Sequence, residues 1–196
     1  DADVDQAVAA AKQAFEGREW RCMDPKERSK ILYKCGNLIK NNALELIGLE
    51  MSSSGGTFNR ITRMDLPATI DLFRTLAEEV LVYPFVEYKP PRGVPEQVHA
   101  QVWKEPVGVC GLITPWNFPM LLLAMKLAPA LAAGNTVVVK PAEITPTSSI
   151  RLVQILQEVL PKGVLNIVPG HGDVVGETMS LHKDINKISF TGSTNI

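Results

Sequence analysis

The stretch that decides the fold is Val107–Pro119, which reads VGVCGLITPWNFP. Its first half is a short apolar run rich in β-branched residues, which is typical of a strand buried on both faces of a parallel sheet. Pro115 ends this run abruptly, and Asn117 follows two residues later. The pattern therefore predicts a polar side chain held just beyond the end of a buried strand.

Three further apolar runs follow, each separated from the next by a segment of helix length: Thr136–Lys140, Leu165–Val168 and Lys187–Phe190. Strands that alternate with helices at this spacing predict an α/β fold, with a parallel sheet, right-handed crossovers and flanking helices. Ligands of such sheets bind beyond the carboxyl ends of the strands. The residues that the pattern places there are Asn117, Lys140, Glu143, Gly170, Gly172 and Thr191.

The composition excludes several classes of protein. The chain has 196 residues, of which 45% are hydrophobic and 21% charged, and this balance is ordinary for a soluble globular protein of one or two domains. A net charge of −1 and scattered basic residues predict neither nucleic acid nor an anionic membrane as a partner. The longest apolar stretch, 120–133, is interrupted by Lys126 and Pro129 and is too short to span a bilayer.

The cysteines and histidines predict no metal site and no disulfide framework. Cys22, Cys35 and Cys110 are an odd number without metal-ligand spacing, which favours a reducing, cytoplasmic location. Cys110 lies inside the predicted central strand, so we expect an inert core thiol there and not a nucleophile. His171 and His182 have no partner spaced for metal ligation.

The first 80 residues predict amphipathic helices with recognisable start signals. Four helices are expected. The first follows a capping box at Asp3 and Gln6, and the second begins at Asp24 and Pro25, with Glu27 reaching back to the cap. The third starts at about Asn42, and the fourth runs from Thr57 to Val80 with a kink or restart near Pro67. We interpret these helices as packing elements and assign no chemistry to them.

The prolines between Tyr83 and Val94 predict an extended excursion, and 97–104 then alternates as a strand does. Val98, Ala100 and Val102 share one face of this predicted strand, which leaves the other face for water or a partner. The alternative is a plain edge strand.

Three motifs together resemble a known family. TPWNFP at 114–119, KPAE at 140–143 and FTGST at 190–194 are similar, in order and spacing, to signatures of the NAD(P)-dependent aldehyde dehydrogenase superfamily. The resemblance covers most of the chain and is closest from Lys104 onward. It implies a Rossmann-like cofactor domain with a helical N-terminal part at 1–80, an extended oligomerisation segment at 81–105 and an incomplete NAD-binding sheet at 106–196.

The resemblance also implies a reaction. In this family an aldehyde is oxidised to a carboxylic acid through a thiohemiacetal on a cysteine, and the enzymes form homodimers or homotetramers. The cysteine nucleophile and the glutamate base follow the FTGST motif, beyond this sequence, so this chain alone is expected to be inactive.

The catalytic candidates are Asn117 and Lys126. The resemblance makes Asn117 the amide donor that stabilises an oxyanion, although asparagine at a strand end is by itself more often a turn residue. Lys126 either extends its ammonium group to water or, as in some family members, relays protons from a cavity that lowers its pKa.

The cofactor candidates follow the strands. Lys140 and Glu143 are placed to meet an adenosine ribose, and Glu143 would repel a 2′-phosphate, which favours NAD with NADP as the alternative. Gly170, Gly172 and Gly176 have the spacing GxGxxxG, which by itself is only weak evidence for a dinucleotide site. The full predicted set is Ile113, Thr114, Pro115, Trp116, Lys140, Glu143, Gly172, Gly176, Phe190, Thr191, Gly192 and Ser193. We expect 191–193 to open a helix whose N–H groups hold a phosphate.

Two other functions stay open from the sequence. The chain could belong to a non-catalytic nucleotide-binding or structural relative that kept the fold, or to a relative that reduces acyl-phosphates or acyl-CoA. Residues beyond this sequence decide the substrate.

Overall fold

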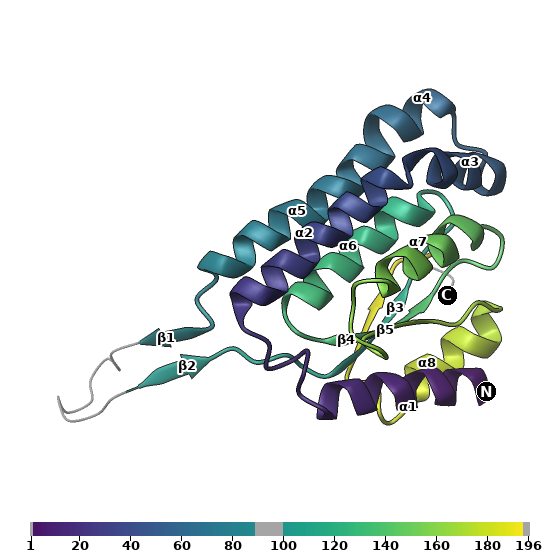
Figure 1. The fold of residues 1–196 in the computed structure, drawn as a ribbon. Coiled ribbons are helices and arrows are strands. Elements are labelled where there is room, and N and C mark those ends of the chain that lie inside the picture. The colour runs from purple at the N-terminus through teal and green to yellow at the C-terminus, as the bar shows by residue number, and fades with distance from the viewer. Residues whose placement is uncertain (1, 89–99, 194–196) are drawn as a thin grey trace.

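The computed structural model describes residues 2–88 and 100–193. Its centre is a parallel sheet in the order β5-β4-β3-β6 (Figure 1). The strands are β3 Val109–Ile113, β4 Thr136–Lys140, β5 Leu165–Ile167 and β6 Lys187–Phe190. The predicted parallel α/β sheet is therefore confirmed, with β3 beginning two residues later than the apolar run. Gly108, which has a φ of +126°, stands directly before it.

Helices cover both faces of this sheet (Figure 1). One face packs against α1 Ala2–Glu16 and α8 Glu177–Leu181, and the other against α2 Pro25–Asn41, α5 Leu66–Val82, α6 Pro119–Ala132 and α7 Thr147–Gln157. α3 Ala43–Ser54 and α4 Phe58–Arg60 lie at one end of the long helices (Figure 1). Successive side chains of β3 point to opposite faces of the sheet and so pack against both layers of helices. Val109 packs toward α1, whereas Cys110 and Leu112 pack toward α6. Among the described residues, no helix is long and apolar enough to cross a membrane.

The predicted helix starts are confirmed in part. Asp24 caps α2, since its carboxylate accepts from the N–H of Lys26 at 2.8 Å. The prediction that Glu27 reaches back to this cap is wrong, because Glu27 pairs with Lys30 at 2.6 Å. Asp3 is also not the N-cap, since α1 already includes Ala2, and its carboxylate instead adds negative charge to the first turn.

A π-helical turn interrupts the fourth predicted helix. The turn η1, Ile61–Asp65, joins α4 to α5, and the N–H of Leu66 bonds back to the carbonyl of Ile61. Pro67 is the second residue of α5, directly after this turn. The predicted restart near Pro67 is confirmed. A π-turn also changes which side chains align, because residues five apart come together.

A separate two-stranded antiparallel sheet projects from the body (Figure 1). β1 Val86–Tyr88 pairs with β2 Gln101–Trp103, and the sequence did not predict β1 as a strand. Val98 and His99 of the predicted strand lie outside the described residues. Neither face of β2 is buried, since the side chains of Val102 and Trp103 are 37% and 66% exposed. The division of the chain at residues 80 and 105 stays a prediction.

Glycine follows the end of α6, and proline precedes the start of α7. α6 ends before Gly134, whose φ of +87° is the left-handed conformation that glycine favours after a helix. α7 begins at Thr147, directly after Pro146. It ends at Gln157, four residues before Pro161, so the proline is not what terminates it.

Candidate functional site

Three strands end side by side and bring the predicted motifs together. Ile113 of β3 pairs with Lys140 of β4 on one side and with Phe190 of β6 on the other. The same pairing continues one residue past the strands. The main-chain N–H of Thr114 donates to the Lys140 carbonyl at 3.1 Å, and the main-chain N–H of Thr191 donates to the Ile113 carbonyl at 3.2 Å. Segments that are up to 77 residues apart in sequence therefore form one edge.

Asn117 lies on the loop that leaves this edge. Its side chain is exposed and makes no hydrogen bond with the described part of the chain. Its neighbours are held: the Thr145 hydroxyl donates to the Trp116 carbonyl at 3.4 Å, and the Phe118 ring lies 4.7 Å from the Arg60 guanidinium. An amide that is free to donate is thus carried on a fixed loop.

Lys140 and Glu143 form an ion pair at the end of β4. The ammonium group of Lys140 donates to Glu143 Oε2 at 3.0 Å and to the Pro141 carbonyl at 3.2 Å. The pKa of Glu143 is lowered, first because its own main-chain N–H donates to the carboxylate and then because Lys140 does. Glu143 is therefore ionised at neutral pH, and an ammonium group has three N–H donors, so Lys140 keeps one beyond these two bonds.

The predicted glycine segment approaches this ion pair from the third strand. Residues 172–176 form the π-turn η2 before α8, and Gly176 faces the Lys140 side chain, since a Cβ there would lie 4.0 Å from Lys140 Cδ. At Gly170, with φ +157°, a Cβ would lie 2.5 Å from Val175, so glycine is required for this turn. Gly172 faces open space.

The segment after β6 does not form the expected helix over the residues described. Thr191, Gly192 and Ser193 have no regular structure, and residues 194–196 lie outside the described part. The Phe190 ring folds over Gly192, where a Cβ would lie 2.3 Å from the ring. A side chain at Gly192 would therefore displace Phe190.

Lys126 connects α6 to β6. Its ammonium group donates to the Ser189 hydroxyl at 3.0 Å, and burial lowers its pKa. The side chain is partly buried, so it does not simply extend into water. A role in proton relay stays a prediction.

All three cysteine thiols lie away from the strand ends that carry Asn117. Burial raises the pKa of Cys35 to about 12 and also raises that of Cys110, so both are inert core thiols at neutral pH. Cys22 is exposed, and the hydrogen bond from Arg18 lowers its pKa. It lies near Trp20, whose indole donates to the carbonyl of Asn135 at the amino end of β4, opposite the candidate site.

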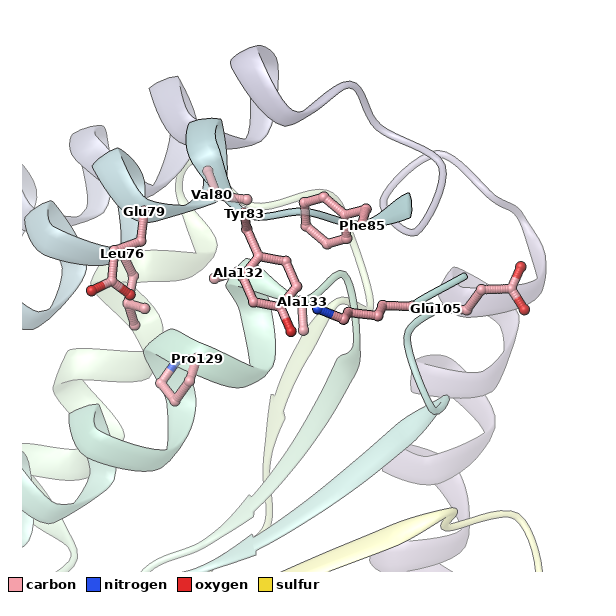
Figure 2. Close-up of a pocket in the computed structure, with 10 residues that line it drawn as sticks. Leu76, Glu79, Val80, Tyr83, Phe85, Glu105, Pro129, Ala132 and Ala133 are labelled. Carbon is pink, nitrogen blue, oxygen red and sulfur yellow. The ribbon is translucent and has the colours of Figure 1, made fainter. Parts of the chain in front are cut away.

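A cavity of about 310 Å³ lies at that opposite end (Figure 2). It is lined by the ends of α5 and α6 and by the segment entering β1, with the Tyr83 and Phe85 rings 4.9 Å apart in an edge-to-face arrangement. Pro129 and Ala132, which line its other side, precede β4. The cavity is therefore separate from the edge where Asn117 and Lys140 lie. No group of three or more potential metal-binding side chains gathers within residues 2–88 and 100–193.

The helical N-terminal part contributes to the site, which the sequence did not predict. Glu50 of α3 and Asp65 of η1 are fully buried beside the loop that carries Asn117. A signal was present in the sequence, because Glu50 follows Leu46 and Ile47 at helical spacing and so belongs to the buried face of α3.

A family model described as the aldehyde dehydrogenase family matches residues 1–196. The chain belongs to the aldehyde dehydrogenase family. It is 43% identical over 198 residues to aldehyde dehydrogenase 1A1 of Equus caballus, covering 99% of this chain and 38% of that protein. It is 40% identical over 200 residues to cytosolic 10-formyltetrahydrofolate dehydrogenase of Xenopus tropicalis, covering 99% of this chain and 22% of that protein.

Solved structures of this family share the fold. An NAD⁺ complex of an aldehyde dehydrogenase from Bacillus cereus superimposes with a TM-score of 0.93 at 37% identity, covering 99% of this chain and 39% of that one. Betaine aldehyde dehydrogenase from Staphylococcus aureus, in complex with NAD⁺, gives 0.91 at 36% identity, covering 98% and 37%. The chain thus spans less than half the length of these relatives.

Proposed function

We propose that this chain is the NAD-binding part of an aldehyde dehydrogenase that oxidises an aldehyde to a carboxylic acid. The observation that carries the proposal is the register of β4, β3 and β6, which brings Lys140, Asn117 and Thr191 to one edge of the sheet. Membership of the family supports the reaction class. Ligands of parallel α/β sheets bind at this edge.

Asn117 is proposed to donate to the substrate oxygen. When a thiolate attacks the aldehyde carbon, the new carbon–sulfur bond moves the carbonyl electron pair onto oxygen, which becomes an oxyanion. An amide N–H fixed toward that oxygen stabilises the charge without rearranging. The exposed amide of Asn117, on a loop held at Trp116 and Phe118, suits this role.

The residues after β4 fit the adenosine end of NAD. The Glu143 carboxylate, ionised and 42% exposed, would accept from the ribose hydroxyls, and the remaining N–H of Lys140 would donate to them. The open space at Gly172 and the closeness of Gly176 to Lys140 leave room beside this pair. A negative Glu143 favours NAD over NADP. NAD, when bound, supplies the acceptor for the hydride.

The nucleophile is proposed to come from a cysteine that this chain does not supply. Cys35 and Cys110 are buried, and Cys22 lies by the amino end of β4. Lys126, held by Ser189 on β6, is the proposed proton relay. This chain alone is accordingly expected to be inactive.

The oligomeric state and the cellular location of the enzyme are also proposed, the first from exposed aromatic side chains and the second from the cysteines and a relative. Tyr88 and Trp103 of the projecting β1–β2 sheet are 73% and 66% exposed, and such exposed aromatic side chains suit contact with a second copy in a homodimer or homotetramer. Three unpaired cysteines and a cytosolic relative support a cytoplasmic location.

An activity assay on the complete protein tests this function. Purified protein is given NAD with a panel of aldehydes, and separately NADH with an acyl-CoA or an acyl-phosphate. Aldehyde-dependent reduction of NAD supports the proposal. Oxidation of NADH by the acyl donors alone would show the reductase alternative, and nucleotide binding without either reaction would show the non-catalytic one.

A further inference from the structure

Charged side chains are buried beneath the loop that carries Asn117. Glu50 of α3 and Asp65 of η1 are both 0% exposed, which is rare for carboxylates that lack a specific partner. Both have their partners on or next to this loop. The arrangement therefore calls for an explanation beyond filling the core.

Glu50 holds the start of the helix that follows Asn117. Its Oε1 accepts from the main-chain N–H of Met120 at 3.3 Å, across 70 residues of sequence. Met120 is the second residue of α6, and N–H groups in the first turn of a helix have no partner within the helix. The carboxylate of α3 thus caps α6 from outside and fixes where its first turn lies, three residues after Asn117.

Arg60 and Asp65 hold the residue directly after Asn117. Arg60 Nε donates to Asp65 Oδ2 at 3.1 Å, a pairing of residues five apart that the π-turn makes possible. The guanidinium so oriented lies 4.7 Å from the centre of the Phe118 ring. Gly56 makes room for it, because a Cβ there would lie 2.3 Å from Arg60 Nη2.

We infer that Glu50, Arg60 and Asp65 are positioning residues that fix the aim of the Asn117 amide by holding Phe118 and Met120. The inference rests on the proposed function, since it needs Asn117 as the oxyanion donor. Asn117 makes no hydrogen bond of its own to the described residues, so its orientation depends on its held neighbours. The bond from Thr145 to Trp116 restrains the other side of the loop.

A double-mutant cycle on the complete protein tests this inference. Asn117→Ala is expected to lower kcat roughly 100- to 1,000-fold, and Glu50→Ala roughly 10- to 100-fold, with the dissociation constant of NAD unchanged. In the Asn117→Ala background, Glu50→Ala should lower kcat less than about threefold further, because the donor that it positions is already gone. Glu50→Gln keeps an acceptor for the Met120 N–H and should stay within about threefold of the wild type.

Two further variants act on the same loop without removing the buried carboxylate. Phe118→Leu deletes the ring beneath Arg60, and Gly56→Ala displaces the guanidinium, so both should lower kcat and both should lose their effect in the Asn117→Ala background. They decide the question if Glu50→Ala fails to fold by circular dichroism. The control is Glu45→Ala, which removes an exposed pair with Arg151 from the same helix α3 and should leave kcat unchanged.

Equal fold losses with and without Asn117 would overturn the inference, because a purely structural role acts in both backgrounds. An unchanged kcat in Asn117→Ala alone is a different outcome. It would remove the role of Asn117 in the proposed function, and the inference with it.

Discussion

The ammonium group of Lys140 lies 3.0 Å from Glu143 Oε2, and the two side chains differ sharply in exposure, at 4% and 42%. The lysine is therefore fixed within the protein, while its partner reaches the surface at the end of β4. A buried cation that orients an exposed anion is suited to recognise neutral ribose hydroxyls and to reject a phosphate.

This geometry predicts how the choice between NAD and NADP can be altered. Glu143→Gln removes the negative charge but keeps the size of the side chain, so NADP should bind about fivefold more tightly relative to NAD. That change corresponds to roughly 1 kcal/mol, as expected for a charge screened at a partly exposed position. Isothermal titration with both dinucleotides gives the ratio. Glu158→Gln, at the far end of α7, is the control and should leave it unchanged.

Burial of Glu50 predicts a pH-dependent stability. Desolvation raises the pKa of Glu50, and the nearby Asp65 raises it further, whereas the Ser148 hydroxyl, the Met120 N–H and Arg60 lower it. The folded state therefore holds this proton more tightly than the unfolded state. Its contribution is fully present below the unfolded pKa of about 4.3 and is lost as pH rises through the folded pKa.

Glu50→Gln tests this dependence because glutamine does not titrate. Urea denaturation from pH 4 to pH 8 should show the variant gaining stability relative to the wild type as pH rises. A constant difference across that range would mean that Glu50 does not change its protonation state on folding. Asp65, whose pKa burial also raises, titrates in both proteins and so cancels in the comparison to first order.

The proposed relay role of Lys126 predicts a limb in the pH profile of kcat for the complete enzyme, that is, a pH range over which kcat changes. Because burial lowers its pKa, the change in kcat that follows its deprotonation should lie below the ordinary lysine value of about 10.4. Lys126→Gln should abolish this limb, as steady-state rates across alkaline pH would show. Lys183→Gln, an exposed lysine before β6, should retain it. Retention of the limb in Lys126→Gln would exclude the relay role.

Arg28 is predicted to be essential for stability and to take no part in the reaction. Its guanidinium, 3% exposed, donates to the carbonyls of Ala132, Trp20, Arg21 and Met23. Arg28→Met removes all four of these bonds, although the Trp20 carbonyl still accepts from the Met23 N–H, and should lower the free energy of unfolding by at least about 3 kcal/mol. Chemical denaturation measures this loss, and Lys34→Met on the exposed face of α2 should change it by less than about 0.5 kcal/mol.

The sheet could be predicted from sequence because its signal is local. The apolar runs that end at Ile113, Lys140 and Phe190 mark the strands, and the helix-length segments between them require parallel pairing. β1 was not predicted because it has only three residues and neither of its faces is buried, so hydrophobic patterning carries no information about it.

The candidate site could be predicted only where its residues follow strands. Arg60 and Asp65 pair through a π-turn, and no sequence pattern predicts this local change of helical period. Glu50 contacts Met120 across 70 residues, which local patterns cannot predict either. The helix predicted from Thr191 is not seen over the described residues. Only residues 191–193 are described after β6, and three residues are fewer than one turn of an α-helix.

The proposed role of Asn117 as the oxyanion donor is tested most directly by the kcat of Asn117→Ala in the complete protein, measured as aldehyde-dependent reduction of NAD. We expect a fall of roughly 100- to 1,000-fold, with the dissociation constant of NAD unchanged, because the amide acts on the oxyanion and not on the cofactor. An Asn117→Ala protein that folds, binds NAD and oxidises aldehydes at the wild-type rate would contradict this role.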